Sequence, residues 1–234
     1  MKRWLVGLGL LLSLGWASPV FADSQTLDIA PIYQEDPSMV WLAVGEMLLR
    51  DYFQLDAVDP DGDYQCGINK LFWGKNSSCW SDCKTCLGPS GTMSNFEQMI
   101  VQYPVALNLL RGKPAALALI YTSDDKPLTW SKLKDEIGNN QRPVVAGINP
   151  VSDSPRHVGV ADRVVLIIGY SEESGEKWVI VNDPYPYALQ KQEPYNDADN
   201  ETVVVNHQYK IHYDKFINGL GWTYSGYGLN DPNQ

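Results

Sequence analysis

The sequence predicts an α+β fold in which a helical N-terminal half packs on a C-terminal antiparallel sheet. Helical periodicity and capping signals lie between about residues 38 and 137, whereas short apolar runs separated by turns follow from residue 143. Helices therefore precede strands, unlike the regular strand–helix alternation of a parallel sheet. Hydrophobic residues make up 44% of the 234-residue chain and charged residues 20%, a composition that excludes a disordered tail, a collagen and a coiled coil.

Residues 1–22 are predicted to form a secretory signal peptide. Lys2 and Arg3 give a positive start, Trp4–Trp16 is an apolar run, and Val20–Ala22 suits cleavage after Ala22. The run is too short to span a bilayer well, although an uncleaved anchor is the alternative. The leader therefore indicates a periplasmic or secreted protein, with no membrane span after its removal.

The rest of the chain, residues 23–234, is expected to form one acidic domain. Its helical, cysteine-rich half covers about residues 23–138, and its sheet half covers about residues 139–234. The formal net charge of the whole chain is −10, from 28 acidic and 18 basic residues. A basic footprint for nucleic acid is absent, so we expect no nucleic-acid partner. No cofactor is predicted.

Three helices are predicted in the first half from apolar spacing and N-capping residues. In the first, Trp41, Val44 and Leu48 fall on one face. In the second, Ser94 and Glu97 match a capping box. The predicted helices are Val40–Phe53 after the N-cap Ser38, a helix that begins at Ser94, and Trp130–Ile137 after the N-cap Thr129.

Four strands and a last helical turn are predicted in the second half. The runs are rich in β-branched residues, and turns such as Ser171–Gly175 separate them. The predicted strands are Pro143–Ile148, Val164–Tyr170, Trp178–Val181 and Thr202–Val205, and the helical turn is Tyr213–Ile217.

The chain contains four cysteines, which all lie in a turn-rich stretch near residues 59–86. An even number in an exported chain favours disulfides, with three pairings open. A zinc or iron–sulfur site is the alternative, although we predict no metal. Asp59, Asp61 and Asp63 lack the later ligands of a calcium loop, so we interpret them as a solvated turn. The stretch is predicted to be a loop that needs crosslinks. The cysteines are Cys66, Cys79, Cys83 and Cys86.

Gln34 stands six residues before Val40, and Trp41 and Ala43 follow at the start of the predicted helix. This spacing resembles that of the papain-like cysteine peptidases in their compact bacterial form, where a Gln precedes a Cys-Trp-Ala-Ala helix start. The family's Gln contributes to the oxyanion hole, and its Cys is the nucleophile at the positive end of the helix. The resemblance implies the first role for Gln34, but Val40 occupies the nucleophile position.

Two later matches extend the resemblance over most of the chain after the leader. Residues 142–148 are similar to the strand before the family's catalytic His. Arg163–Tyr170 and then Trp178–Tyr185 resemble the His strand, its Gly-Tyr and a following strand that ends in Asn or Asp before Pro. The resemblance makes Asp183 the counterpart of the His-orienting residue and places Arg163 at the His position. We expect Arg163 and Asp183 to form a charge pair in the former cleft.

The two replacements remove the family's chemistry. Valine has no nucleophilic atom, and arginine stays protonated and cannot act as a base. The resemblance therefore implies a secreted, non-catalytic papain-like domain that binds a peptide or protein in a degenerate active-site cleft. The binding residues expected from it are Gln34, Trp41, Arg163, Asp183 and Tyr185.

The alternative is an active secreted cysteine peptidase, or another hydrolase with a non-standard nucleophile and base. It needs a free cysteine such as Cys86, together with His157 or His207 as the base. His157 lies in a polar loop, and His207 and His212 are predicted to lie on the outer face of the sheet. The state of the thiols therefore discriminates between the two hypotheses.

Overall fold

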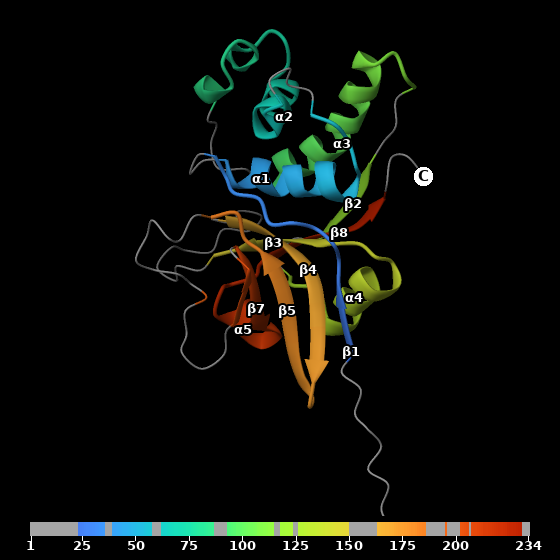
Figure 1. Cartoon of the computed structure of the whole chain (residues 1–234), viewed down its shortest axis with the longest axis vertical. Coiled ribbons are helices and arrows are strands. Elements are labelled where there is room, and N and C mark those ends of the chain that lie inside the picture. The colour runs from blue at the N-terminus through green and yellow to red at the C-terminus, as the bar shows by residue number, and fades with distance from the viewer. Residues whose placement is uncertain are drawn as a thin grey trace, which may run out of the picture.

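An antiparallel sheet of eight strands forms one end of the molecule, and α1, α2 and α3 gather at the other (Figure 1). The computed structural model describes residues 23–35, 39–57, 62–86, 93–114, 118–123, 126–149, 163–185, 195, 202–205 and 207–230. The predicted α+β class is confirmed. Within these ranges, no helix is long and apolar enough to cross a membrane.

The strand order is β2-β8-β3-β4-β5-β7-β6, with β1 paired to β4 outside this path. Both β1 and β3 pair with β4, β3 along Arg163–Ile167 and β1 along Gly169–Glu172, so they lie end to end beside the same strand. The strands are β1 (Asp23–Thr26), β2 (Leu119–Ser123), β3 (Val144–Ile148), β4 (Arg163–Glu173), β5 (Glu176–Asn182), β6 (Thr202–Val205), β7 (Gln208–His212) and β8 (Tyr224–Asn230).

The strands β3, β4 and β5 form the centre of the sheet. Val144–Ile148 is buried throughout, and so is β4 from Val164 to Tyr170, because both faces of these strands are covered. The hairpin between β4 and β5 turns at Ser174 and Gly175, whose φ angles are 54° and 86°. Two successive positive φ angles are typical of the tight turn that matches strand twist.

The helical segments alternate between regular and irregular turns. They are α1 (Val40–Glu46), the π-helical η1 (Met47–Tyr52), α2 (Tyr64–Trp73), the 3₁₀ segments η2 (Ser78–Trp80) and η3 (Cys83–Cys86), α3 (Met93–Leu110), α4 (Trp130–Lys134), the π-helical η4 (Asp135–Asn139) and α5 (Tyr213–Asn218). The helix α1 packs against β4 on one side and against α2 and α3 on the other, so it joins the helical layer to the sheet. Leu42 and Val44 of α1 and Leu48 of η1 belong to one continuous apolar core.

Several predicted elements are confirmed, although their ends differ. The predicted helix over Val40–Phe53 is α1 with η1, and Met39 rather than Ser38 occupies the N-cap; Ser38 lies outside the described residues. Thr129 caps α4 by accepting a hydrogen bond from the Lys132 N–H. The helix α3 already includes Ser94, so the prediction that Ser94 caps it is wrong by at least one residue.

The largest error concerns residues 59–86, where the sequence predicts a loop and the structure contains α2. Asp63 is the N-cap of α2, because its carboxylate accepts a hydrogen bond of 2.8 Å from the Cys66 N–H. The interpretation of Asp63 as part of a solvated turn is therefore wrong. The strands β1 and β2 precede residue 138 and were not predicted, whereas α5 follows it where a helical turn is predicted.

All four cysteines form disulfides, Cys66 with Cys83 and Cys79 with Cys86. The first joins α2 to η3, and the second joins η2 to η3. This chooses one of the three pairings and fits the predicted disulfides. Disulfides are also compatible with an extracellular location.

Candidate functional site

The segment between β1 and α1 crosses the end of the sheet and carries the first site residue, Gln34. The Asn182 side chain donates a 2.8 Å hydrogen bond to the Ile29 carbonyl, and the Gln34 N–H donates a 3.1 Å bond to the Pro184 carbonyl. Because Asn182 ends β5 and Pro184 follows it, the segment is held against the carboxyl end of this strand. Gln34 therefore lies beside Pro184, the residue that follows Asp183.

The Gln34 side chain is buried but has no hydrogen-bonding partner. The residue is only 6% exposed, and neither Nε2 nor Oε1 has a partner among the described residues. Buried amides almost always have partners, because each unmet donor or acceptor costs about 1–3 kcal/mol. An unpaired buried amide is therefore a site where a ligand could supply the missing hydrogen bonds.

A buried network holds the backbone on both sides of Gln34. The Gln65 side chain donates to the Tyr33 carbonyl at 2.8 Å and to Glu46 at 3.1 Å, and its oxygen accepts from the Glu35 N–H at 3.2 Å. Burial raises the pKa of Glu46, although the Gln65 hydrogen bond and nearby Arg50 act in the opposite direction. Burial also raises the pKa of Glu35, with Asp63 and Glu46 adding to the effect. The sequence does not predict this network, because nothing in the local pattern links α1 to α2.

Asp183 is completely buried, and its carboxylate has two hydrogen bonds of 2.9 Å. One oxygen accepts from the Tyr185 N–H, which closes a turn just after β5, and the other accepts from the Tyr195 hydroxyl. The Tyr195 ring stacks on Tyr209 of β7 at 4.1 Å. These contacts fix the carboxylate as part of the chain's own packing.

His207 lies on the other side of the same turn. It is buried at 9% exposure, so the prediction that it lies on the outer face is wrong. Its Nδ1 is 3.1 Å from the Asp183 carbonyl oxygen, and its own carbonyl accepts from the Asp183 N–H at 2.9 Å. A φ of 64° at His207 turns the chain between β6 and β7 and brings the ring to 4.0 Å from that of Tyr33.

Arg163 begins β4, and its guanidinium lies 3.9 Å from the centre of the Tyr185 ring. This is a cation–π arrangement. The guanidinium covers Tyr185, and the Asp183 carboxylate accepts from Tyr185 and Tyr195. The charge pair between Arg163 and Asp183 stays a prediction. Arg163 and Tyr185 are both partly exposed.

The two α1 residues of the resemblance have different environments. Val40 is the first residue of α1 and is partly exposed, and α1 packs against β4, the strand that Arg163 begins. Trp41 is 5% exposed and makes an edge contact with Phe72 of α2, so it is a core residue in this structure. His157 lies outside the described residues, and His212 stacks on Trp178 at 3.5 Å.

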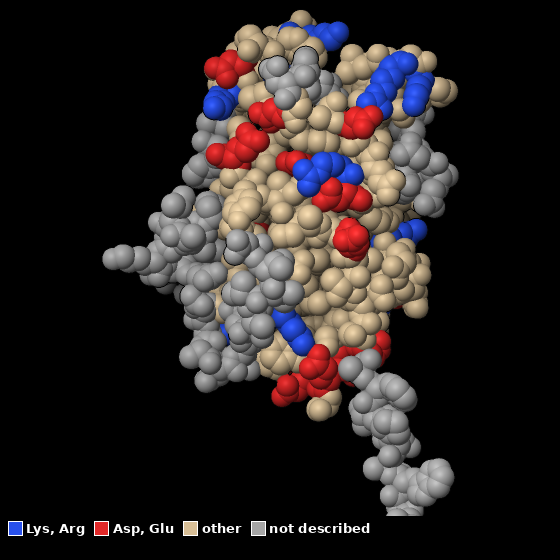
Figure 2. Space-filling model, viewed as in Figure 1, with Lys and Arg blue, Asp and Glu red and all other residues tan. Residues whose placement is uncertain are grey.

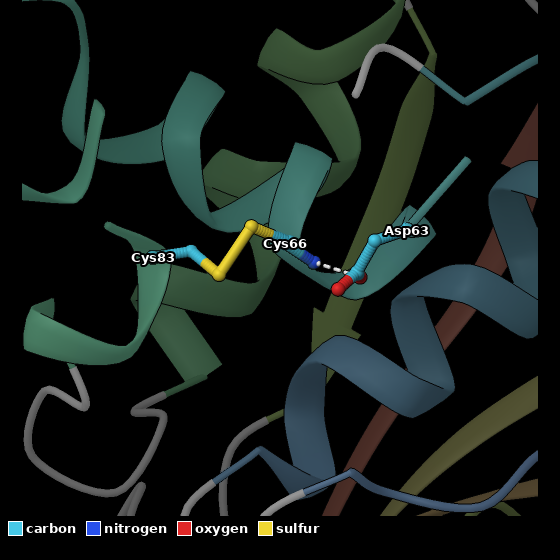
Figure 3. A group of neighbouring side chains, drawn as sticks. All are labelled: Asp63, Cys66 and Cys83. Carbon is cyan, nitrogen blue, oxygen red and sulfur yellow. Dashed lines mark hydrogen bonds between the residues drawn. A yellow bond between two sulfur atoms is a disulfide. The ribbon is translucent and has the colours of Figure 1, made fainter. Parts of the chain in front are cut away.

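Asp63, Cys66 and Cys83 form a group whose ligand atoms lie within 4.8 Å of one another (Figure 3). The two sulfurs are bonded to each other, and the Asp63 carboxylate caps α2. Disulfide sulfurs are not the thiolates that zinc and iron–sulfur clusters require. This arrangement can crosslink a helix but does not provide a metal site in its oxidised form.

Acidic and basic side chains are interspersed over the face shown in Figure 2. The described part of that face carries no continuous basic surface, which agrees with the net charge of −10. Electrostatic attraction to a polyanion therefore has no support from this view.

No family model matches the chain, and no curated protein matches it. What the structure defines is a class: an α+β domain with two disulfides and an antiparallel sheet. The function must therefore be argued from the residues at the end of β5.

Proposed function

We propose that this protein is an exported, catalytically inactive papain-like domain that binds an extended peptide or a protein segment beside Gln34. One observation carries the proposal, the buried Gln34 amide without a partner. An amide offers two donors and an acceptor, which are the groups needed to pair with a peptide backbone. A peptide that reaches Gln34 must displace the atoms that now cover this side chain. Its backbone can then form hydrogen bonds with Nε2 and Oε1 of Gln34, which have no partner in the described structure.

Aromatic and cationic side chains near Gln34 support a peptide ligand. Tyr33 is 50% exposed although it precedes a buried residue, and it contacts the His207 ring. Tyr185 and Arg163 are partly exposed and stack on each other. Tyr and Arg are enriched where proteins bind proteins, because they combine apolar area with hydrogen-bonding groups.

The absence of a usable nucleophile supports binding rather than hydrolysis. Val40 stands at the family's Cys position, and the four cysteines of the chain are all in disulfides. The thiol version of the alternative, with Cys86 as nucleophile, therefore lacks a thiol in the oxidised protein. A hydrolase with another nucleophile is the second candidate, but within the described ranges no hydrogen bond joins a Ser or Thr hydroxyl to a His.

The test is a binding assay on the mature chain, residues 23–234. Peptides selected from a random eight-residue library are measured by fluorescence anisotropy against the wild type and Gln34→Leu. We expect Gln34→Leu to weaken binding about tenfold, since it removes one or two backbone hydrogen bonds. The melting temperature should stay the same or rise, because the substitution also removes an unsatisfied buried amide.

The matched control is Gln102→Leu, the same substitution at an exposed position on α3. It should bind the selected peptides as the wild type does. The proposal is wrong if no library peptide binds, if Gln34→Leu binds with unchanged affinity, or if the unmodified protein hydrolyses the peptides.

A further inference from the structure

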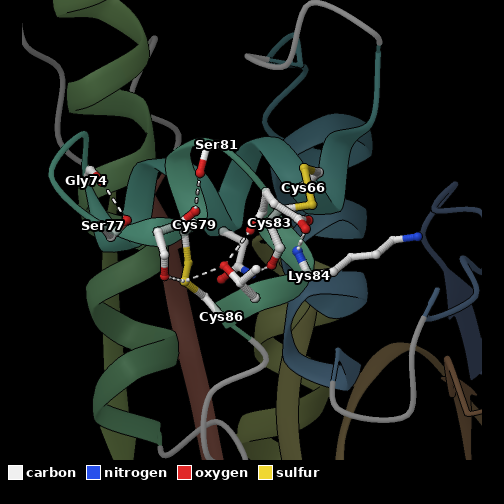
Figure 4. The surroundings of a disulfide bond; sticks show 12 residues. Cys66, Gly74, Ser77, Cys79, Ser81, Cys83, Lys84 and Cys86 are labelled. Carbon is white, nitrogen blue, oxygen red and sulfur yellow. Dashed lines mark hydrogen bonds between the residues drawn. A yellow bond between two sulfur atoms is a disulfide. The ribbon is translucent and has the colours of Figure 1, made fainter.

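We propose that the Cys79–Cys86 disulfide is an exchange site for an external dithiol, which attacks the Cys86 sulfur, while Cys66–Cys83 is a structural crosslink. The proposal concerns the surface of the helical end and is independent of peptide binding. The two disulfides meet in η3, where Cys83 and Cys86 begin and end the segment (Figure 4). Their surroundings nevertheless differ in access, hydrogen bonding and charge.

Access favours Cys86. It is partly exposed, whereas Cys79 is completely buried and Cys66 and Cys83 are each 7% exposed. Thiol–disulfide exchange needs an in-line approach of a thiolate to one of the two bonded sulfurs. Of the four sulfurs, only that of Cys86 belongs to a partly exposed residue.

Hydrogen bonding also favours Cys86. The Ser78 hydroxyl lies 3.6 Å from its sulfur, and because a disulfide sulfur carries no proton, the hydroxyl must be the donor. The Thr85 hydroxyl lies 3.8 Å away and donates to the Asp82 carbonyl at 2.8 Å. A donor at this sulfur makes it more electrophilic and later stabilises the Cys86 thiolate.

Charge protects the other disulfide. A carboxylate oxygen of Asp63 lies within 4.8 Å of both the Cys66 and the Cys83 sulfur (Figure 3). This negative charge repels an incoming thiolate and disfavours a thiolate leaving group. Asn69 also donates a 2.9 Å hydrogen bond to the Cys83 carbonyl, which ties this end of η3 to α2.

The exchange has two balanced steps. A thiolate of the dithiol attacks the Cys86 sulfur, the Cys79–Cys86 bond breaks, and Cys79 leaves and takes up a proton. The second thiol of the reductant loses its proton and attacks the reductant's own sulfur in the mixed disulfide, so that Cys86 leaves as a thiolate beside Ser78. The dithiol is oxidised to a disulfide, and the protein gains two electrons and ends as the Cys79 and Cys86 thiols.

The test uses the mature chain with dithiothreitol, followed by N-ethylmaleimide labelling and peptide mass mapping over time. We expect Cys79 and Cys86 to be labelled together, about tenfold faster than Cys66 and Cys83, as expected when a nearby carboxylate opposes thiolate attack. Far-ultraviolet circular dichroism should not change during the first phase. The proposal is overturned if Cys66 and Cys83 are labelled first, or if all four cysteines are labelled at one rate. It is also overturned if the first phase of labelling occurs only with loss of the dichroism signal.

Three substitutions test the physical causes. Ser78→Ala should slow the first phase about threefold to tenfold, the effect of losing one hydrogen bond to a charged group. Ser81→Ala is the control, because the Ser81 hydroxyl donates to the Ser78 carbonyl and not to the Cys86 sulfur. The rate of the first phase in this variant should match that of the wild type. Asp63→Asn keeps an N-cap of equal quality and removes the charge, so it should accelerate reduction of Cys66–Cys83. Unchanged rates in both Ser78→Ala and Asp63→Asn would contradict the assignment.

Discussion

The carboxylate of Asp183 shows how far one residue's role depends on its distant partners. A resemblance to peptidases makes it the group that orients a catalytic His. In the structure its oxygens accept hydrogen bonds from the Tyr185 backbone and the Tyr195 hydroxyl, and it is completely buried. A buried carboxyl group needs such donors, because each unmet buried acceptor costs free energy. Asp183 therefore stabilises the turn after β5 whether or not any chemistry takes place there.

Removing one of these donors should destabilise the fold. Tyr195→Phe keeps the ring that stacks on Tyr209 but leaves one Asp183 oxygen without its donor. We expect the free energy of unfolding to fall by about 2 kcal/mol, the range for a buried hydrogen bond to a charged group. Urea denaturation measures the change. Tyr121→Phe, at a residue that is 61% exposed, is the control and should shift it by less than about 0.5 kcal/mol. Equal effects of the two substitutions would contradict this role of Tyr195.

At this scale the sequence identified the residues that local spacing can reveal. Gln34 and Asp183 are marked by their neighbours in the chain, and the structure joins Gln34 to Pro184, the residue after Asp183. Tyr195 and His207 were missed or misplaced, because their partners lie on other elements and no short pattern encodes the contacts. Trp41 matched a motif, but its exposure of 5% depends on packing against Phe72, which α2 supplies.

Among the elements, α2 is joined to η3 by the disulfide that closes the longer loop. The Cys66–Cys83 disulfide closes a sequence separation of 17 residues, whereas Cys79–Cys86 closes only seven. If crosslinks stabilise mainly by restricting the unfolded chain, the longer loop should contribute about 0.8 kcal/mol more. Cys66 and Cys83 are also buried, so their loss disturbs more packing.

This difference leads to a prediction for paired replacements. Cys66→Ala with Cys83→Ala should lower the free energy of unfolding by about 3 kcal/mol. Cys79→Ala with Cys86→Ala should lower it by less, and guanidinium titration of both proteins measures the difference. If the second pair proves the more damaging, the structural role assigned to Cys66–Cys83 is wrong.

The elements that sequence analysis found are those with strong internal signals. The apolar runs of β3, β4 and β5 and the Thr129 cap of α4 are examples. The strands β1, β2, β7 and β8 were missed because they are short or contain polar residues and glycine, so pairing with their neighbours decides their structure. The helix α2 was missed because it contains Gly67 and because turn residues flank it on both sides. The N-cap residue Asp63 resembles one of these turn residues.

For the whole molecule, the first strand is joined to the rest by charge as well as by backbone pairing. Lys134 contacts the carboxylates of Asp23 and Glu172, and the Tyr170 hydroxyl donates to Asp23 at 3.0 Å. The Lys134 hydrogen bond lowers the pKa of Asp23, with Tyr170 contributing in the same direction. A carboxyl group with a lowered pKa stabilises the fold above the pKa of the unfolded chain and loses that contribution as the pH falls through its folded value.

Asp23→Asn should therefore be less stable than the wild type at neutral pH, and the difference should disappear in acid. The expected difference is about 0.5 kcal/mol, because the pair is exposed to solvent. Thermal unfolding measured from neutral pH down to below the ordinary Asp range tests this. A difference that grows as the pH falls would show that the sign is wrong. Asp135→Asn serves as a comparison, since the pKa of Asp135 is lowered chiefly by a hydrogen bond from Asn139, four residues along the same helix.

The pairing of β1 with β4 has a consequence for how the molecule is made. Asp23 and Tyr170 are 147 residues apart, so β1 finds its partner only when most of the polypeptide is present. Loop closure over such a distance is entropically slow, and contacts of this kind delay folding. A chain of this topology can dock its first strand only after the β4–β5 hairpin has been synthesised.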